Sequence, residues 1–469
     1  MSDHQASQLS RTVAFVRESL RDNEIDYTQG PVRRALGLLA IPMMLELSME
    51  AVFAVVDIAF VSRLGTDAVA AVGITEALVT VLYAIAIGLG MGVTAMVSRR
   101  IGAGEADEAA QVTGQAIWLC AMLSIAVGIF GVAYAEDMLR MMGASEGVVE
   151  QGTGFTSVLL GGSASILYLF LLNAAFRGAG DAAVALRSLW LANGINIILD
   201  PCFIFGLGPF PEMGVTGAAV ATTIGRGVGV VYQLYYLIGG RGRLEFHLRH
   251  LQLVPSLMYR MIVISAGGVG QFLIATSSWI VIMRIVALYG SAAIAAYTIA
   301  LRLIEFVFLP AWGLGNAAAT LVGQNLGASQ PDRAEKSAWQ ASKYNAYFMT
   351  GLGTLSVIGA PWITGLFTND PEVMRYGVNC IRIFGIGYPL YAVGMIMTQA
   401  LNGAGDTATP SALNLLCFWL VQIPLAWWLA EPLSFGPNGV FVAIVVAESL
   451  LSVLSVIVFR RGRWKQQIA

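Results

Sequence analysis

The sequence predicts an all-α integral membrane protein with twelve transmembrane helices, arranged as two six-helix bundles that an internal repeat relates to each other. Of the 469 residues, 57% are hydrophobic and only 12% are charged, whereas soluble domains carry about a quarter charged residues. The apolar stretches lack the alternating pattern of a β-barrel. The spans are therefore helices, which satisfy their own backbone hydrogen bonds in lipid.

Twelve stretches are long and apolar enough to cross the hydrocarbon core, which takes about 20 residues. The first six make a predicted N-lobe over residues 35–239, and the last six make a predicted C-lobe over residues 258–459. The expected spans are 35–62, 69–98, 111–134, 153–176, 186–206, 214–239, 258–287, 292–322, 339–366, 377–401, 410–430 and 438–459.

Three polar segments flank these lobes: an N-terminal segment (1–34), a linker (240–257) and a tail (460–469). Within the first, residues 8–22 have two open interpretations, a short amphipathic helix at the membrane surface or a solvated tail. Lysine and arginine concentrate on the segments at one side of the membrane, and the other side holds only Arg63, Arg140 and Arg375. The positive-inside rule then places all three polar segments in the cytoplasm, as expected for a multi-pass protein of the plasma (inner) membrane.

Several classes of function are excluded by composition. A net charge of -2 gives no reason to expect a nucleic-acid partner. The four cysteines lie far apart, and none of the three histidines lies in a span, so neither a metal centre nor an intramembrane enzyme is predicted. No P-loop lysine follows the glycine-rich turns, which argues against use of ATP. We expect no cofactor and no enzymatic activity.

The two halves of the sequence align with each other at a constant offset of 225. Residues 68–71 (AVAA) meet 293–296 (AIAA), and 178–181 (GAGD) meet 403–406 (GAGD). A duplicated unit with an even number of helices gives two copies that are parallel in the membrane. Transporters are commonly built from such repeats, with the substrate site between the halves.

The first span carries three acids, Glu46, Glu50 and Asp57. They fall within an arc of about 40° on the helix and extend over about 16 Å of its length. Burial and mutual repulsion both favour the protonated form of a carboxyl group, so we interpret the stripe as proton-responsive, with Glu46 and Glu50 as a candidate proton ladder. Purely structural polar contacts of Glu46 or Glu50 remain an alternative. Pro42 interrupts the same span and predicts either a hinge or a static kink.

A second polar group is expected from the fifth and sixth spans. Asn196 and Asp200 are four residues apart on one helix face, and Thr222 lies in the next helix at a depth similar to that of Asp57. Carboxylate, amide and hydroxyl oxygens at one level suit a shared proton or Na⁺, so we predict an ion site at Asp57, Asn196, Asp200 and Thr222 and no other metal site. Separate contacts that tie neighbouring helices together are the alternative.

The C-lobe lacks these polar residues at the positions that the repeat assigns. At an offset of 225, Ile282, Val421 and Leu425 replace the aspartates and the asparagine. Ion coupling is therefore predicted in the first lobe alone.

These residues together resemble the multidrug and toxic compound extrusion (MATE) family across all twelve spans. The resemblance rests on Pro42 and Asp57 followed by Leu64-Gly65, on the paired RGAGD and NGAGD turns, and on residues 321–327 (LVGQNLG). It implies two six-helix bundles that form a V around a central cavity. It also implies a secondary antiporter that exports cationic, amphipathic organic compounds in exchange for H⁺ or Na⁺.

The resemblance also assigns residues. Asp57 looks like the family's essential acid of the first helix, and Asn196, Asp200 and Thr222 look like the other members of a first-lobe cation site, with Asn173 as a polar neighbour. The stretches 258–287 and 377–401 contain no Asp or Glu, which makes the chain look like the DinF-like branch, coupled through the first lobe.

We therefore expect a monomeric carrier whose partners are small organic substrates and the bilayer, with Phe53, Trp279 and Ile282 as candidate walls of the cavity. A lipid-linked glycan or lipid flippase of the same superfamily is the alternative. It would need a cavity rich in Arg and Lys, yet the only cations expected well inside the spans are Arg226, Arg284, Arg302 and Arg382. A channel is a further alternative, and the asymmetric acids of the two lobes favour a carrier.

Overall fold

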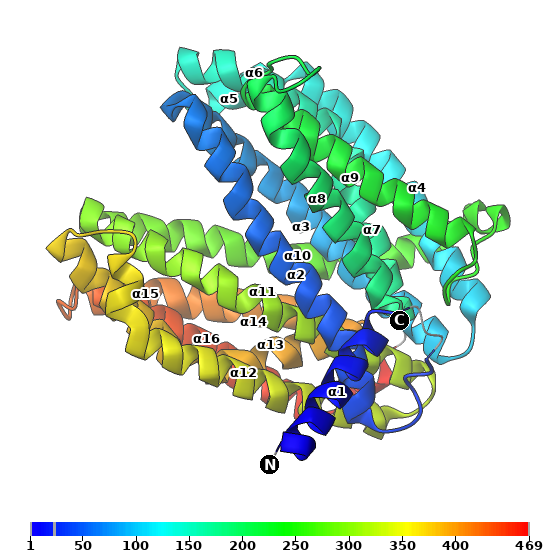
Figure 1. Cartoon of the computed structure of the whole chain (residues 1–469). Coiled ribbons are helices and arrows are strands. Elements are labelled where there is room, and N and C mark those ends of the chain that lie inside the picture. The colour runs from blue at the N-terminus through cyan, green and yellow to red at the C-terminus, as the bar shows by residue number, and fades with distance from the viewer. Residues whose placement is uncertain (1, 22–24, 468–469) are drawn as a thin grey trace.

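Two helical bundles diverge like the arms of a V in the computed structural model, which describes residues 2–21 and 25–467 (Figure 1). The bundles meet at the end of the molecule where α1 (Ser2–Ser19) and the C-terminus lie, here called the closed end. They separate toward α5 (Ala135–Met141) and α15 (Ile423–Ala430), at what we call the open end.

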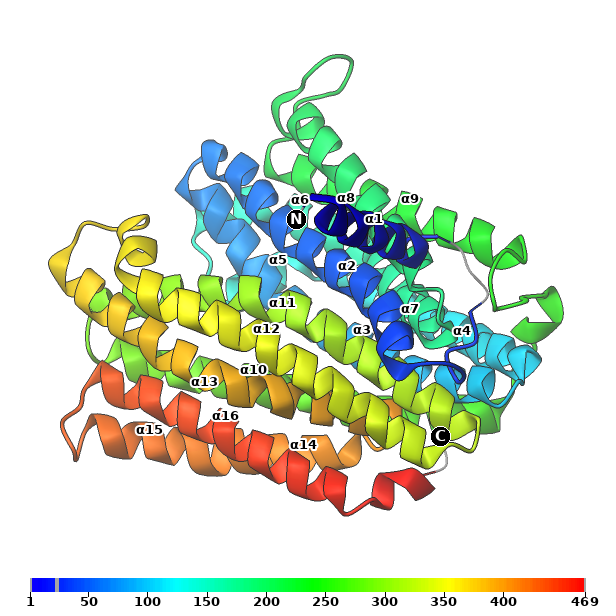
Figure 2. The ribbon, with the colours of Figure 1, turned by 60° about the horizontal axis from the view of Figure 1, so that its bottom comes forward.

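The N-lobe and the C-lobe each contain six helical spans. Besides α5, the N-lobe comprises α2 (Val32–Val61), α3 (Thr66–Gly102), α4 (Ala106–Ala133), α6 (Glu146–Gly161), α7 (Ser163–Ala179), α8 (Ala182–Phe205) and α9 (Val215–Ile238). Besides α15, the C-lobe comprises α10 (Pro255–Ala287), α11 (Ser291–Gly327), α12 (Pro331–Gly365), α13 (Pro371–Gly403), α14 (Ala408–Asn414) and α16 (Pro437–Arg460). Short helical turns are η1 (Ser62–Leu64), η2 (Leu248–Leu251) and η4 (Arg463–Gln466). Figure 2 shows α12, α13 and α16 running along the C-lobe.

The helices begin and end where local chemistry dictates. Proline occupies the first turn of α10, α12, α13 and α16, where its missing N–H is not needed. The Asp370 carboxylate caps α13 by accepting from the backbone N–H groups of Glu372 and Val373. Large apolar side chains such as Ile129, Ile386 and Leu420 remain on the outside of the bundles, as expected for surfaces that face lipid.

The number of spans agrees with the prediction of twelve helices. By length and composition, ten helical segments of the described chain can cross a membrane, and an eleventh forms when α6 and α7 are counted together. The remaining one, α9, carries Thr222, Arg226 and Gln233, which lower its hydropathy.

Two predicted spans have an irregular backbone that the sequence did not reveal. The span predicted at 153–176 begins earlier, at Glu146, and bends by 42° between α6 and α7. The bend falls at Gly161-Gly162, where a side chain on Gly162 would overlap Thr223 of α9. In the span predicted at 410–430, the stretch between α14 and α15 is a π-helix, η3 (Leu415–Gln422).

The repeat is preserved in backbone conformation. Gly65 and Gly290, which the repeat pairs, have φ of 104° and 91° immediately before α3 and α11. Gly180 and Gly405, paired by the same offset, have φ of 98° and 90° in the two GAGD turns. These left-handed conformations require glycine, which explains why the same residues stand in both halves.

The closed end is sealed by two equivalent backbone contacts between the lobes. A side-chain carbon on Gly102 of α3 would overlap the carbonyl of Gln324 on α11, and one on Gly327 of α11 would overlap the carbonyl of Arg99 on α3. An offset of 225 converts each contact into the other, so the interface has the reciprocity of a two-fold axis.

The first helix of each lobe also crosses to the other lobe. Gly88 of α3 lies against Val269 of α10, and Gly313 of α11 lies against Met43 and Met44 of α2. The repeat pairs Gly88 with Gly313 and Met44 with Val269, so these two contacts are equivalent as well. The two copies are therefore related by a pseudo-two-fold axis, as the predicted parallel repeat requires.

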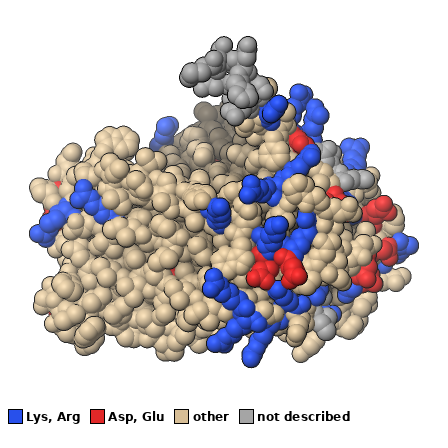
Figure 3. Space-filling view, turned by 90° about the horizontal axis from the view of Figure 1, so that it is seen from below, with Lys and Arg blue, Asp and Glu red and all other residues tan. Residues whose placement is uncertain are grey.

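Residues 8–19 of the segment 8–22 lie in α1, and residues 20 and 21 follow the end of the helix. Residue 22 lies outside the described residues. Phe15 packs over Gly37 of α2, and Glu18 forms an ion pair of 2.5 Å with Arg34. Of the two interpretations of this segment, the structure supports a helix. On the face seen in Figure 3, most Lys and Arg side chains lie toward the closed end.

Candidate functional site

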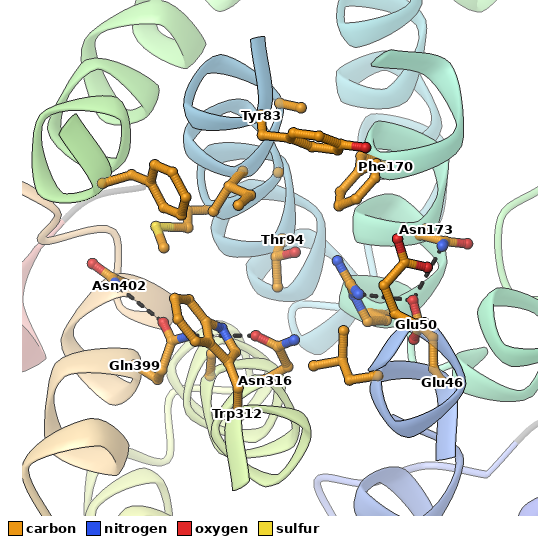
Figure 4. A pocket seen from close by; sticks show the side chains of 18 of the residues that line it. Glu46, Glu50, Tyr83, Thr94, Phe170, Asn173, Trp312, Asn316, Gln399 and Asn402 are labelled. Carbon is orange, nitrogen blue, oxygen red and sulfur yellow. Dashed lines mark hydrogen bonds and ion pairs between the residues drawn. The ribbon is translucent and has the colours of Figure 1, made fainter. Parts of the chain in front are cut away.

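A cavity of about 370 Å³ lies between the lobes and has chemically different walls. Figure 4 shows Glu46, Glu50 and Asn173 on one side, and Trp312, Asn316, Gln399 and Asn402 on the other. The first group comes from α2 and α7 of the N-lobe, and the second from α11 and α13 of the C-lobe. Aromatic side chains of both lobes complete the lining: Tyr83, Phe170, Phe272 and Trp312. Such a mixture of apolar walls with a few polar groups is typical of sites for small organic molecules.

Glu46 is held at the N-lobe wall by two donors from α7. Its Oε1 accepts from Asn173 Nδ2 at 3.1 Å and from Arg177 Nη1 at 3.0 Å. Its Oε2 is buried and has no hydrogen-bond partner among the described residues. Only 1% of Glu46 is exposed, so this acid depends on Arg177 for its charge balance.

Glu50, one turn further along α2, has a different set of partners. Asn193 of α8 donates to its Oε2 at 3.1 Å, and Arg226 of α9 lies 4.0 Å from its Oε1. Arg226 also donates to the hydroxyl of Tyr83 at 2.8 Å. Glu50 therefore faces the cavity while it contacts helices of the N-lobe interior.

Asp57 belongs to a third group, which includes the other residues predicted for the ion site. The carboxyl groups of Asp57 and Asp200 adjoin each other. Asn196 donates to Asp200 at 3.4 Å and to the Thr222 hydroxyl at 3.0 Å. The structure thus brings Asp57, Asn196, Asp200 and Thr222 together at the α2–α8–α9 contact.

Three unsatisfied oxygen atoms lie in this third group. Asp57 Oδ1, Asp200 Oδ2 and Asn196 Oδ1 are all buried without a donor in the described chain. Two adjoining carboxyl groups without enough donors favour a bound proton or cation between them. Among the described residues, no three or more His, Cys, Asp and Glu side chains form a metal-binding group. The oxygen set therefore fits a monovalent ion better than a transition metal.

Asn173 does not lie beside this aspartate pair. Its amide donates to Glu46, and its Oδ1 accepts from Ser188 and Gln233. The reason is its place on α7, whose contact with α2 occurs at the level of Glu46. Asn173 therefore orients Glu46 at the cavity wall.

The expected aromatic and apolar walls were wrong. Ile282 is fully buried in the C-lobe core, and Trp279 lines a separate small void inside that lobe. Phe53 is 8% exposed and does not line the cavity. Trp279 and Ile282 point into the C-lobe, because α10 packs its other face on α3.

Arg177 is the functional candidate that sequence reasoning missed. It lies in the last turn of α7, beside the RGAGD turn, where the spans were expected to reach the cytoplasm. The carbonyls of Arg177 and Gly178 accept from Thr320 and Gln324 of the C-lobe at 3.1 and 2.9 Å. These contacts hold the two lobes together around Arg177, and the side chain of Arg177 forms part of the cavity wall.

Pro42 lies inside α2, which remains one continuous helix from Val32 to Val61. Its ring nitrogen cannot donate to the carbonyl of Leu38. The next residue, Met43, touches Gly313 of the C-lobe through its backbone. Arg302, which was expected well inside a span, forms an exposed ion pair of 3.2 Å with Glu305.

Known proteins share this architecture. The chain is 26% identical over 460 residues to the probable multidrug resistance protein NorM of Thermotoga maritima, covering 96% of this chain and 97% of that protein. It is 28% identical to an FAD transporter of Shewanella oneidensis, over 90% and 93% of the two chains. A structure described as the outward-facing conformation of a multidrug resistance MATE family transporter superposes with a TM-score of 0.88, at 24% identity over 94% of this chain and 98% of that one.

A family model identifies the chain. The MatE model matches twice, at residues 42–202 and 269–428, once in each lobe. The two matches cover most of the chain and reproduce the internal repeat. This family consists of membrane transporters rather than enzymes, in agreement with the prediction from composition. The protein is therefore a multi-pass membrane transporter that belongs to the MATE family.

Proposed function

We propose that the protein is a secondary active antiporter that exports amphipathic organic compounds, cations among them, in exchange for H⁺ or Na⁺. The observation that carries this proposal is the contact between Asp57 and Asp200, two carboxyl groups with buried oxygens that lack donors. An acid pair of this kind inside a membrane is costly unless an ion loads and unloads there. Multidrug transport in named relatives supports the substrate class.

The proposed orientation follows from charge. The basic segments gather toward the closed end, and positive charge favours the cytoplasmic side. The closed end is then cytoplasmic, with both termini inside, and the open V faces outward in the plasma (inner) membrane. In this state the aspartate group lies near the open end of α2, where outside ions arrive.

In the proposed cycle, an ion from outside binds at Asp57, Asn196, Asp200 and Thr222 and changes the contacts of α2 with α8 and α9. Because α2 also lines the cavity with Glu46 and Glu50, the change reaches bound substrate and releases it outward. Pro42 is the proposed hinge, since the lost hydrogen bond lets α2 bend beside its contact with Gly313. The absence of acids from α10 and α13 within the stretches 258–287 and 377–401 supports coupling in the first lobe, as in the DinF-like branch.

The driving force is sufficient without ATP. A membrane potential of about 100 mV supplies ~2.3 kcal/mol per charge, and one pH unit supplies ~1.4 kcal/mol. Together they support a substrate gradient on the order of several hundred-fold per electrogenic proton. A flippase for lipid-linked glycans is less well supported, because Arg177 is the only Lys or Arg among the described residues that line the cavity.

The test is transport by the purified protein in liposomes with separately imposed H⁺ and Na⁺ gradients. Uptake of a fluorescent cationic dye should accelerate with one of the two gradients and stop when that gradient is dissipated. Flux that continues down the dye's own gradient at the same rate, whichever ion gradient is present, would show a pore instead of an antiporter.

A further inference from the structure

A hollow of about 390 Å³, separate from the central cavity, lies at the closed end between α3, α4 and α10. Its polar lining comprises Arg100 of α3, Glu108 and Gln111 of α4, and Ser256 and Arg260 of α10. The first two helices belong to the N-lobe and the third belongs to the C-lobe. The hollow therefore lies where the lobes meet, and no residue of the described chain lines both it and the central cavity.

Three arginines gather at this hollow. Arg100 and Arg260 line it, and both lie close enough to Arg99 to repel its positive charge. Arg100 is compensated by Glu105, at 3.1 Å, and by Glu108. Among the described residues neither Arg99 nor Arg260 forms an ion pair, and Nη1 of Arg99 is buried without an acceptor. The cluster therefore holds one more positive charge than negative charges.

Hydrogen-bond donors accompany this excess charge. Ser256 lies in the first turn of α10, where backbone N–H groups have no partner within the helix and the helix dipole is positive. The side chain of Arg260 forms no hydrogen bond within the described chain, and its planar fork matches the oxygens of a phosphate. These groups suit an oxyanion, and the single excess charge matches a phosphodiester.

Apolar side chains continue from the hollow along the outside of α10. Val112 and Leu257 belong to the wall of the hollow. One turn beyond Arg260, Ile262 and Val263 are 44% and 53% exposed, and Val263 lies on the same helix face as Arg260. The acyl chains of a lipid would cover these side chains, whereas a soluble phosphate would not. Basic pockets between helices at the cytoplasmic side are typical sites for acidic lipid headgroups.

The repeat pairs the three arginines with neutral residues. Their counterparts at the offset of 225 are Ala35, Gln324 and Asn325. The two copies of the repeat make equivalent backbone contacts at the closed end, so the shared packing does not require positive charge at these positions. The arginines of the first copy therefore need a reason other than packing.

We propose that this hollow binds the headgroup of an anionic phospholipid, with its phosphodiester on Arg260 and Ser256, near Arg99 and Arg100, and its acyl chains along α10. Because Arg100 belongs to the N-lobe and Arg260 to the C-lobe, the bound headgroup lies between the lobes at the closed end. The inference does not depend on the proposed transport cycle, which uses other residues.

The test measures binding of short-chain lipids to the purified full-length protein in detergent, through the rise in its unfolding temperature. Dioctanoyl phosphatidylglycerol carries a net negative charge, and in dioctanoyl phosphatidylcholine an ammonium group cancels the charge of the same phosphodiester. We expect half-saturation by phosphatidylglycerol at a concentration at least about 10-fold lower than by phosphatidylcholine, since hydrogen bonds to charged groups are worth that much. Inorganic phosphate, which has no acyl chains, should cause no rise at these concentrations.

Arg260→Gln is the decisive variant and should lose the preference for phosphatidylglycerol. Arg260→Lys keeps the charge without the planar fork and should keep part of the preference. The matched control is Arg33→Gln, which removes an exposed arginine from the first turn of α2, outside the hollow. This control should bind both lipids as the wild type does.

Four results overturn the proposal: equal binding of the two lipids by the wild type, a preference that persists in Arg260→Gln, an equal loss of preference in Arg33→Gln, or saturation by inorganic phosphate at the concentration that phosphatidylglycerol needs. The last would make the hollow a site for free anions. If Arg260→Gln does not fold, the wild-type comparison and Arg260→Lys decide. Failure of the proposed antiport would leave all these measurements unchanged, because no ion gradient exists in detergent.

Discussion

Asp57 adjoins Asp200 and, among the described residues, has no arginine within 4.0 Å, in contrast to the other two acids of α2, Glu46 and Glu50. Glu46 has Arg177 and Glu50 has Arg226 within 4.0 Å, whereas among the described residues no ion pair is formed by either aspartate. One membrane helix therefore carries two acids with resident counter-ions and a third acid that faces another acid. The third is the one suited to exchange its ion during a transport cycle.

Thr222→Val tests whether the surrounding oxygens contribute to the ion site. The variant keeps the shape of the side chain and removes the hydroxyl that accepts from Asn196 at 3.0 Å. One hydrogen bond is worth about 0.5–1.5 kcal/mol, so half-saturation by the coupling ion should shift to a concentration ~2- to 10-fold higher. Ion-dependent uptake measures the shift, and Thr223→Val on the same helix is the control. Equal shifts in both variants would remove Thr222 from the site.

Trp312→Ala tests the cavity as the substrate site. Trp312 lines the cavity from the C-lobe, and loss of a large aromatic contact should weaken binding of an aromatic dye by at least about 10-fold. Fluorescence titration of the purified protein measures the affinity. Trp362→Ala, at a side chain that is 71% exposed on α12, provides the comparison and should bind normally. Normal binding by the Trp312 variant would place the dye elsewhere.

Gly327→Ala tests the seal of the closed end. An added methyl group would overlap the carbonyl of Arg99 across the lobes, and such overpacking typically costs about 1–3 kcal/mol. Since the contact exists only when the closed end is shut, the variant should populate the opposite state, in which that end is open. Thiol labelling at Thr320→Cys, added to the same chain, should then become faster. Gly351→Ala, where no atom lies within 4 Å, should leave the labelling rate unchanged.

The aspartate group could be predicted from sequence because each of its members obeys a simple geometric rule. Asn196 and Asp200 are four residues apart, and Thr222 and Asp57 lie at matching depths, so helical periodicity is enough to bring them together. The repeat was equally accessible, because glycines with positive φ must recur wherever the turn recurs. Both signals depend on local structure, which one sequence specifies well.

The sequence did not predict three features: the position of Arg177, the bend at Gly162 and the π-helix that ends at Gln422. The reason is that none of them follows from local structure. Each depends on how far one helix slides along another, which no local pattern encodes. Arg177 was assigned to a loop because it precedes a glycine-rich turn, yet the lobes close beyond it through Thr320 and Gln324. The predictions for Trp279 and Ile282 were wrong for a similar reason, since the direction in which both side chains point depends on how α10 packs on α3.

Gradient-driven uptake by the Asp57→Asn variant is the most direct test of the coupling hypothesis. The asparagine retains the shape of the side chain, but it has no negative charge to balance that of a bound H⁺ or Na⁺. Proteoliposomes containing this variant should still bind substrate but should accumulate it at least ~10-fold less than wild type, since most of a several hundred-fold gradient depends on the ion. Glu305→Gln, which neutralises an exposed acid outside the cavity, should accumulate substrate normally. Wild-type accumulation by Asp57→Asn would contradict the account.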